Sequence, residues 1–478
     1  MKAGAASLLE ADWVLPISAP PIPRGAVWVV GGQIAAVAPA GALRAQVDPA
    51  TTIRSFPGSV LMPGLVNAHT HLEYSAFRDF SSASTFPVWM LRLLLARRKL
   101  TSDDYATSAR WGAYESVCAG TTCVADISFE GWTTLQAAAE VGLRGRVYIE
   151  LFGLADTKIP AVMGLAEERL SEFTAKTTPL LDVGLSPHAP YTVSALLYRE
   201  VARYAHERGL HITTHLGESP AEVEMLVRGR GSIAGVYKVA RLWSRADRAV
   251  PGLRPAAYLA SLGVLSPRML AAHCVQTDED EVTVLASTGA AVAHCPRSND
   301  YLRCGTAPVA ELRAGGVHVG LGTDSLASND SLDMFSEMRA ALVLSEARGR
   351  NGVLTAGEVL RMATVEGARA LGLDDLVGSL EVGKRADLIV VRLPGAGDGT
   401  ELGRATSPDT TAEACGIEER LVSSAGAADV QLTMVDGHIL FDRENPNKAD
   451  RPGLDQAFAA VRARLGLDDT PRLMGERL

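Results

Sequence analysis

The chain has 478 residues, of which 47% are hydrophobic and 21% charged, and its formal net charge is −9 at pH 7. These proportions are typical of a globular protein with a large core, and the length fits a large barrel with an accessory unit. Because the acidic charge is spread without blocks and no apolar run approaches the ~18 residues of a membrane-spanning helix, we expect neither nucleic acid nor a membrane as a partner.

The N-terminal stretch, residues 1–13, carries acidic residues and lacks the apolar run of a signal peptide. The six cysteines are scattered along the chain and form no Cys-x-x-Cys pair. Because disulfides are rare in the cytoplasm, this pattern predicts reduced cysteines and a cytoplasmic protein.

The first part of the chain has the pattern of short strands joined by turns. A strand is predicted over residues 7–17. A hairpin is predicted where Gly31 and Gly32 separate the apolar stretches 26–30 and 33–37. No helical period is present, so residues 1–57 are expected to be all-β.

From about residue 58 to 374, apolar strands alternate with helix-like stretches, which indicates parallel βα units. Eight strands are predicted, at residues 65–71, 121–128, 146–153, 182–189, 211–218, 269–275, 290–298 and 318–325. Helices are predicted at 86–99, 105–119 and 195–208, among others. Eight such units close naturally into a (β/α)8 barrel.

Strand character returns at residues 378–391 and 430–442, with a predicted loop over 394–411 and a closing helix over 455–467. The fold class is therefore α/β, a (β/α)8 TIM barrel with a split β-sandwich formed by the N- and C-terminal segments. The expected domain limits are 1–57 with 375–445 for the sandwich, 58–374 for the catalytic barrel and 446–478 for a C-terminal helical extension.

The stretch NAHTHLEYS, residues 67–75, places His69 and His71 two positions apart at the end of the first barrel strand. Residues i and i+2 of a strand share a face, so the two imidazoles form a ready pair of metal ligands. The alternative is two unrelated polar residues at a strand end. Other strands also end in such groups, namely His188, His215 with Glu218, His273 and Asp324. In a barrel, that end of the strands carries the active site.

The residue types suit one divalent cation, Zn²⁺ or alternatively Fe²⁺, because three imidazoles and a carboxylate hold such an ion and leave a position for water. The cation lowers the pKa of its water, and Glu218 is the best general acid/base to move the proton. His273 is expected to orient the water, and Asp324 to ligate the cation and accept a proton. Each histidine taken singly could instead be a satisfied core or loop residue.

The order His-x-His, His, His-x-x-Glu, His, Asp across eight βα units resembles the amidohydrolase superfamily. The flanks PGLVNAHTHL, GTDS and GSLEVGKRADLIVV resemble its metal-dependent aminohydrolase branch, the ATZ/TRZ-like enzymes. The resemblance places the cation on residues that match His69, His71, His215 and Asp324. It makes Glu218 the proton shuttle and His273 the residue that orients the hydroxide.

The resemblance also bears on metal number and partners. Binuclear relatives carry a bridging lysine where this chain has Ser186-Pro187-His188, so a mononuclear site is implied. In similar deaminases the histidine at this strand end touches the substrate, and His188 is given that role. The expected partner is a small-molecule substrate, and barrels of this branch are commonly homodimers.

The forms HTHLEYS and HLGESPAEVE are similar to the aminodeoxyfutalosine deaminases, which convert the adenine of 6-amino-6-deoxyfutalosine to hypoxanthine in menaquinone biosynthesis. Many adenosyl-type deaminases carry a ribose-binding Glu shortly before a Trp, but here Phe-Pro-Val, residues 86–88, precede Trp89. Glu73 is therefore expected to take over polar recognition, unless it is a solvated loop carboxylate. Arg297 and Ser298 are expected either to bind substrate or to cap the next segment.

Other functions stay open at this point. The same site could serve a deaminase of adenosine, S-adenosylhomocysteine, methylthioadenosine or guanine, or a triazine-type chlorohydrolase. A non-catalytic barrel scaffold is the alternative from another class, but it predicts a damaged set of metal ligands, whereas this set is complete.

Overall fold

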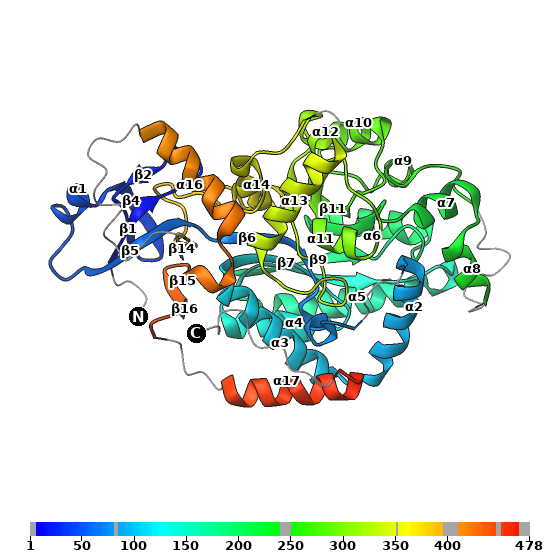
Figure 1. Cartoon of the computed structure of the whole chain (residues 1–478). Helices are drawn as coiled ribbons and strands as arrows, with labels where there is room; N and C mark the ends of the chain where they lie inside the picture. The colour runs from blue at the N-terminus through cyan, green and yellow to red at the C-terminus, as the bar shows by residue number, and fades with distance from the viewer. Residues whose placement is uncertain are drawn as a thin grey trace.

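The computed structural model describes residues 6–80, 85–239, 250–349, 352–394, 410–445 and 451–467. Their strands form two eight-stranded sheets, one entirely parallel and one mixed. Figure 1 shows the parallel sheet wrapped by helices and the mixed sheet beside it. The architecture is an α/β barrel with a separate sheet, as predicted.

The parallel sheet contains the eight predicted barrel strands in chain order. They are β6 (Leu65–Thr70), β7 (Thr121–Ser128), β8 (Arg144–Leu151), β9 (Leu181–Pro187), β10 (Ile212–Leu216), β11 (Met269–His273), β12 (Ala291–His294) and β13 (Val319–Leu321). The seventh strand is shorter than predicted because Pro296 begins a helix. A bridge between Thr70 and Asp324 joins the first and last strands, and the Asp324 N–H donates to the His69 carbonyl at 2.9 Å.

Helices follow the strands and cover the outside of the barrel (Figure 1). They are α2 (Phe86–Ala96), α3 (Ser102–Cys118), α4 (Trp132–Val141), α5 (Ile159–Thr174), α6 (Ala195–Arg208), α7 (Pro220–Arg228), α8 (Ser232–Val239), α9 (Pro255–Ser261), α10 (Glu279–Thr288), α11 (Pro296–Tyr301), α12 (Val309–Ala314), α13 (Met334–Arg348), α14 (Ala356–Met362) and α15 (Val365–Ala370). Short 3₁₀ helices are η1 (Leu72–Phe77), η2 (Arg97–Lys99) and η3 (Asp156–Lys158). The three helices predicted above are confirmed. The second of them begins earlier than predicted because Thr101 and Asp104 form a capping box.

The inside and outside of the barrel hold separate cores because successive side chains of a strand point to opposite faces. Apolar side chains of the strands fill the interior, and residues of α15 and the turn after it close the end where the strands begin. These residues are Val66, Ala68, Cys123, Ala125, Ile127, Tyr148, Leu270, Ala291, Ala293, Ala368, Leu371 and Val377. The interior is therefore filled, and polar side chains gather where the strands end.

The mixed sheet combines strands from both ends of the chain in the order β16-β15-β14-β5-β1-β3-β4, with β2 paired to β1. The strands are β1 (Ser7–Val14), β2 (Ile22–Pro23), β3 (Gly25–Val30), β4 (Gln33–Pro39), β5 (Thr52–Pro63), β14 (Leu388–Arg392), β15 (Val430–Val435) and β16 (His438–Asp442). The predicted hairpin around Gly31 and Gly32 is confirmed, with both glycines at positive φ, 59° and 80°. Gly64 then leads from β5 into the barrel, where a Cβ would lie 2.1 Å from the Thr122 hydroxyl oxygen.

Two sequence-based expectations for this sheet were wrong in part. Residues 1–57 are not all-β, because α1 (Ala40–Arg44) forms there and buries Leu43 against Leu8. The strand predicted over 378–391 begins only at Leu388. The preceding residues make turns that bond backbone to backbone with other parts of the sheet, as Leu380 does with Pro16.

The C-terminal part contributes α16 (Thr410–Ser424), η4 (Ala427–Asp429) and α17 (Arg451–Leu465). The predicted closing helix is confirmed in α17, which lies along α3 (Figure 1). Phe458 stacks on Trp111 with ring centroids 4.1 Å apart, and both side chains are fully buried. The loop predicted over 394–411 lies almost wholly outside the described residues.

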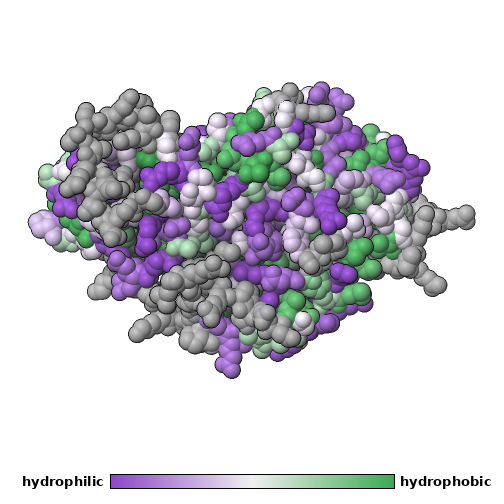
Figure 2. All heavy atoms as spheres, viewed as in Figure 1, coloured by the Kyte–Doolittle hydropathy of each residue, from purple (hydrophilic) through white to green (hydrophobic). Residues whose placement is uncertain are grey.

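On the face in Figure 2, hydrophilic and hydrophobic side chains of the described residues are intermixed. Within the described ranges, no helix has the length and apolar character needed to cross a membrane. The cysteines whose side chains the structure describes, Cys118, Cys123, Cys274, Cys295 and Cys304, are buried and form no disulfide with one another.

A buried ion pair joins the barrel to the mixed sheet. The Arg144 guanidinium on β8 donates to both carboxylate oxygens of Asp387, at 2.6 and 3.0 Å, and the side chains are 6% and 1% exposed. Removing Asp387 leaves the buried Arg144 charge with only a longer contact, 3.4 Å, to Asp436. We predict that Asp387→Ala lowers the free energy of unfolding by about 3–5 kcal/mol, measured by urea denaturation.

A matched control is Arg203→Ala, which removes an exposed arginine paired with Glu200 and Glu207. Its effect on the free energy of unfolding should be much smaller than that of Asp387→Ala because exposed pairs are weak. Equal effects of the two substitutions would show that the Arg144–Asp387 pair does not hold the sheets together.

Candidate active site

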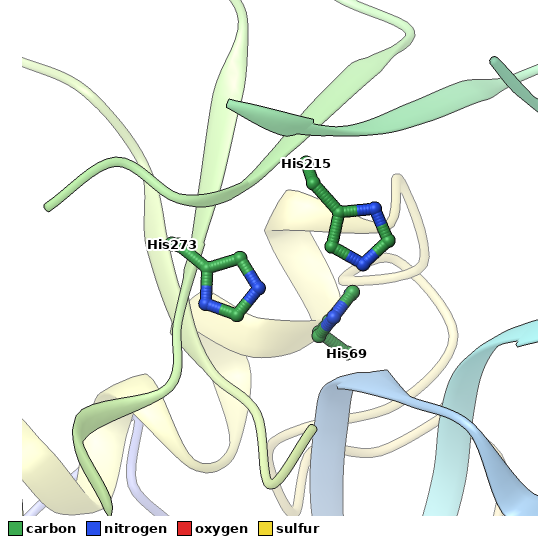
Figure 3. Close-up of side chains that lie close together, drawn as sticks. All are labelled: His69, His215 and His273. Atoms are coloured by element: carbon green, nitrogen blue, oxygen red, sulfur yellow. The ribbon is translucent and has the colours of Figure 1, made fainter. Parts of the chain in front are cut away.

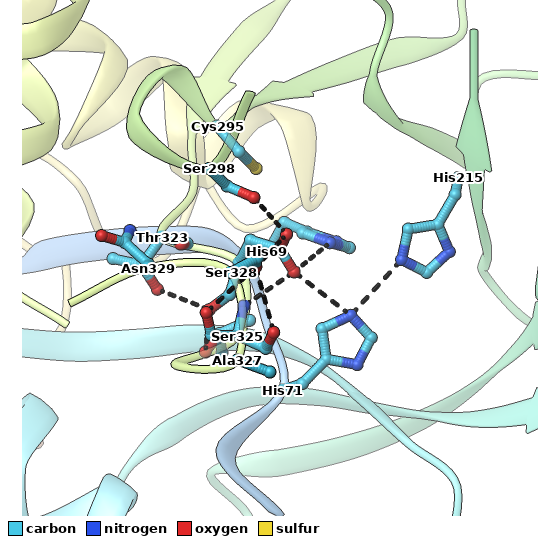
Figure 4. A network of polar contacts seen from close by, with 12 residues as sticks. His69, His71, His215, Cys295, Ser298, Thr323, Ser325, Ala327, Ser328 and Asn329 are labelled. Atoms are coloured by element: carbon cyan, nitrogen blue, oxygen red, sulfur yellow. Dashed lines mark hydrogen bonds and ion pairs between the residues drawn. The ribbon is translucent and has the colours of Figure 1, made fainter. Parts of the chain in front are cut away.

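Four side chains from three places in the barrel converge at the ends of the strands. His69 and His71 lie at the end of β6, His215 on β10, and Asp324 after β13. One carboxylate oxygen of Asp324 lies 3.6 Å from Nε2 of both His69 and His71, and Nε2 of His215 lies 3.3 Å from Nε2 of His71 (Figure 4). The barrel closure between Thr70 and Asp324 is what brings the last of these groups to the first two.

The arrangement fits a divalent cation. Nε2 of His69 is buried and has no hydrogen-bond partner among the described residues. Nδ1 of His215 faces the His188 carbonyl at 2.9 Å, so this nitrogen carries the proton and Nε2 is left with a lone pair. Two ligands of a tetrahedral cation at about 2.1 Å lie ~3.4 Å apart, close to the spacings given above. The donors are thus arranged as ligands rather than as hydrogen-bonded pairs.

The electrostatics of the cluster favour the ligating forms. Burial lowers the pKa of His71 to about 3 and that of His215 well below its ordinary value, so both imidazoles are neutral at pH 7. Burial alone would raise the pKa of Asp324, but the imidazoles of His69 and His273 outweigh it and lower that pKa. Three imidazoles and one carboxylate are a ligand set typical of Zn²⁺.

Two serines hold the Asp324 carboxylate in place. The hydroxyls of Ser298 and Ser328 donate to Oδ2 of Asp324 at 2.6 and 2.8 Å, while the Ser325 N–H donates to Oδ1 at 2.7 Å (Figure 4). Asp324 itself has φ 57°, an uncommon conformation that these bonds help to keep. Ser298 thus contacts a proposed metal ligand. Ser328 carried no signal in the sequence beyond its place after the GTDS motif.

His273 faces the cluster from β11. Its ring lies near those of His69 and His215, with centroids 5.2 and 5.5 Å away (Figure 3). Nδ1 faces the Asn299 side-chain oxygen at 2.9 Å, so Nε2 is the nitrogen left for the site, 3.9 Å from a carboxylate oxygen of Glu218. His273 has φ 73°, and this strained backbone turns the imidazole toward the cluster.

Glu218 stands beside the cluster, just after β10. Burial raises the pKa of its carboxyl well above the ordinary value, and the charges of Asp324 and Glu222 add to that rise. Glu222, which sequence reasoning missed, accepts the N–H groups of Gly217 and Glu218 at 2.9 Å each and fixes this turn. The signal for Glu222 was the helix start that follows Ser219, whose hydroxyl accepts the Glu222 N–H.

The cluster opens into a cavity of about 450 Å³. Its polar end consists of His71, His188, His215, Glu218, His273 and Asp324, and its apolar wall includes Phe86, Trp89, Met90, Leu93, Leu94, Phe152 and Val236. Most of the apolar wall comes from α2. His188 lies between the two ends: its Nδ1 is 2.7 Å from the Thr192 hydroxyl, and its ring stacks on Phe152 with centroids 4.7 Å apart.

Two residues expected near the substrate lie away from this cavity. Glu73 is fully buried in η1, where its carboxylate accepts from the Ser128 hydroxyl and from the N–H groups of Phe129 and Glu130, at 2.7 to 3.2 Å. Arg297 points to the outer side, where it pairs with Asp330. Neither residue lines the cavity, and Ser298 does not line it either, so the structure places none of these three side chains against the cavity, contrary to the prediction.

The structure adds Glu150 and Arg97 to the cavity wall. Glu150 is the last residue but one of β8, so it is an acidic residue near a strand end, as the predicted site residues are. Burial raises its pKa to about 8, against an opposing effect of the Arg97 charge. Arg97, in η2, was expected only as a helical residue, and nothing in the sequence marked it as facing the barrel mouth.

Comparison with known protein families matches residues 60–440 to the amidohydrolase family. The chain is 35% identical over 437 residues to a 5-methylthioadenosine/S-adenosylhomocysteine deaminase of Desulforudis audaxviator, covering 91% of this chain and 93% of the relative. It is 34% identical over 424 residues to a 5′-deoxyadenosine deaminase of Methanothermobacter thermautotrophicus, covering 88% of this chain and 90% of the relative.

Solved structures are similar over almost the whole chain. An adenosine deaminase from Xanthomonas campestris with bound zinc superimposes with a TM-score of 0.81 at 29% identity, covering 97% of this chain and 99% of the other. The atrazine chlorohydrolase of Arthrobacter aurescens, at 24% identity and a TM-score of 0.77, covers 95% of this chain and 100% of its own. The second similarity concerns the fold alone.

We predict that His69→Ala abolishes tight metal binding, because it removes a central donor of the cluster. Metal content per protein, measured after dialysis, should fall from one equivalent to near zero. His294→Ala is a matched control, since His294 is also a buried histidine at a strand end but belongs to none of the potential ligand groups of the described residues. A fully metallated His69→Ala protein would overturn the ligand assignment.

Proposed function

The chain belongs to the amidohydrolase family and is a hydrolase of C–N bonds other than peptide bonds, and from this premise we propose that it deaminates an aminopurine nucleoside with a large 5′ substituent. The lead substrate is 6-amino-6-deoxyfutalosine. The observation that carries this proposal is the cavity, in which a metal cluster and a carboxylate at one end face an apolar wall at the other.

The cavity volume of about 450 Å³ lies in the range of sites for small organic ligands. A purine ring with its amino group at the cluster would place the sugar near His188 and the 5′ substituent against the wall formed by Trp89, Leu93 and Leu94. A nucleoside without a 5′ substituent would leave that wall exposed to water, which is unfavourable. The names of the curated relatives, which act on 5′-modified adenosines, support the same class.

The benzoate of the lead substrate adds an anionic group to an apolar ring. Lys158, at the exposed edge of the cavity, and Arg97 in its wall are cations that suit such a group. The HTHLEYS motif, from which this substrate was expected, contributes Tyr74 to the wall although Glu73 points away. These features favour an anionic, partly aromatic 5′ substituent over a methylthio group.

We further propose that one Zn²⁺ is held by His69, His71, His215 and Asp324. Such a cation supplies Lewis-acid activation of a water molecule, whose pKa it lowers toward neutrality. Hydrolysis forms a C–O bond at the purine carbon that carries the amino group, breaks the C–N bond there, and releases ammonia.

The side chains move the protons of this reaction. Glu218, whose raised pKa suits proton uptake, accepts a proton from the attacking water and delivers it to the purine, on the path to the departing amine. His273 aligns the water through Nε2, because its Nδ1 is fixed by Asn299. Asp324, held by Ser298 and Ser328, can accept the second proton that the leaving ammonia requires.

The direct test is ammonia release by zinc-loaded protein from a panel of compounds. The panel contains 6-amino-6-deoxyfutalosine, methylthioadenosine, S-adenosylhomocysteine, 5′-deoxyadenosine, adenosine, guanine and a chlorotriazine. For the last compound, chloride release is followed as well. We predict the highest kcat/KM with 6-amino-6-deoxyfutalosine and the lowest among nucleosides with adenosine, because the apolar wall contacts the 5′ substituent.

If kcat/KM is higher for methylthioadenosine or S-adenosylhomocysteine than for 6-amino-6-deoxyfutalosine, the proposed lead substrate is wrong, but the proposed class of aminopurine nucleosides stands. Turnover of guanine or the chlorotriazine without any nucleoside would overturn the proposed function.

We predict that Glu218→Gln keeps the bound metal and lowers kcat by about 10²–10⁴-fold, because the amide cannot shuttle a proton. Steady-state ammonia release and metal content are measured on the same preparation. Glu140→Gln, an exposed carboxylate on α4 that pairs with Arg110, is the control and should be as active as wild type. Wild-type turnover in the Glu218 variant would remove this residue from the mechanism.

A further inference from the structure

Glu150 is a buried carboxylate that the proposed reaction does not use. We propose that it binds the ribose hydroxyls of the substrate and thereby selects ribonucleosides over deoxynucleosides. This inference rests on the proposed function and assigns a specificity-determining role to a residue that carried no role in the sequence.

The strand geometry points Glu150 into the site. Tyr148, two residues earlier on β8, belongs to the core inside the barrel. Side chains two apart in a strand share a face, so Glu150 also points inward, above the last filled layer. It lines the cavity and is only 7% exposed, so its carboxylate faces the cavity and not the outer surface.

The Glu150 carboxylate has no hydrogen-bond donor from the parts of the chain that the structure describes. The nearest ring nitrogen there is Nε2 of His188, a neutral imidazole, which lies 3.9 Å from Oε1, too far for a hydrogen bond. By contrast, Glu73 and Glu222 each accept bonds from backbone N–H groups. A buried carboxylate without donors is costly, so its missing donors are best supplied by a ligand.

The position of Glu150 indicates which part of the ligand supplies them. His188 contacts both ends of the cavity: its ring lies 4.8 Å from that of His215 and 4.7 Å from that of Phe152, between centroids. Glu150 stands beside His188, between the metal cluster and the apolar wall. In a nucleoside bound with its amino group at the cluster and its 5′ substituent at the wall, the sugar occupies this middle position.

Neutral hydroxyls suit the carboxylate better than a cation does. The Arg97 guanidinium already acts on the charge of Glu150 from the same cavity wall, so an added ammonium group would be repelled by it. Burial raises the pKa of Glu150 to about 8 in the protein without ligand. Two adjacent hydroxyls offer two O–H donors, which would bond both oxygens and stabilise the ionised carboxylate.

A second metal ion is also disfavoured at this place. Glu150, His188 and His215 do have potential ligand atoms within 4.8 Å of one another. However, Nδ1 of His188 is taken by Thr192, and the two nitrogens of His215 face the His188 carbonyl and the first cluster. Only a carboxylate oxygen of Glu150 and Nε2 of His188 remain as ligand atoms, and the charge of Arg97 acts on both residues.

The experiment compares the best ribonucleoside of the panel with the same compound lacking the 2′ or the 3′ hydroxyl. For wild-type protein, we expect kcat/KM to fall by about 10–100-fold when one hydroxyl is removed, the usual effect of losing a bond to a charged group. In Glu150→Gln and Glu150→Ala, kcat/KM for the ribonucleoside should fall by a similar factor, while kcat/KM for the deoxy compounds should change little. The ratio of kcat/KM for the ribonucleoside to kcat/KM for its deoxy analogue should therefore fall toward one.

This ratio distinguishes a role in substrate recognition from a structural role, because a distorted site would lower kcat/KM for all substrates by the same factor. Glu140→Gln again serves as a control and should keep the wild-type ratio, and metal content is measured for every variant. Equal losses for ribo and deoxy substrates would overturn the role of Glu150 and leave the proposed deaminase function standing. Absence of turnover of any nucleoside by wild-type protein would overturn both.

Discussion

The pairing of the first barrel strand with the residue that follows the last one is the contact on which the site depends. The Thr70–Asp324 bridge, with the Asp324 N–H bound to the His69 carbonyl, closes the sheet and sets Asp324 opposite His69 and His71. Thr70 and Asp324 are 254 positions apart in the chain. A cation held by His69, His71 and Asp324 would therefore link the first and last strands of the barrel. Metal binding and barrel closure should stabilise each other for this reason.

Around this closure the structure concentrates polar groups in a place with little water. Asp324, Glu218 and Glu150 are buried carboxylates, and the imidazoles of His71, His188, His215 and His273 are all kept neutral by burial. Some of these groups are held by the protein, as Ser298 and Ser328 hold Asp324. Others, such as Glu150, have no partner among the described residues. This difference suggests a division between groups fixed for the cation and groups left for the substrate.

Much of the fold followed from local patterns in the sequence. The eight barrel strands, the hairpin at Gly31 and Gly32, and helices such as α6 and α17 were predicted because apolar periodicity and turn residues act over a few positions. Errors arose where distant parts of the chain decide the outcome. The short helix α1 is held by Leu8 and Ala26, and the residues before β14 are held by backbone bonds to Pro16 and Gly32.

For the site, the sequence by itself determined which residues stand at the strand ends, because a strand fixes the direction of its side chains to one of two faces. His69, His71, His215, His273 and Asp324 could therefore be named before the fold was known, and they lie together. Only the tertiary structure decided where side chains on turns and helices point, since that direction depends on packing against remote elements. It turned Glu73 toward the turn after β7, Arg297 toward Asp330, and Ser298 toward Asp324. It also showed that Glu150, among several acidic strand-end residues, was left without a partner among the described residues, because no loop that the structure describes reaches it with a donor.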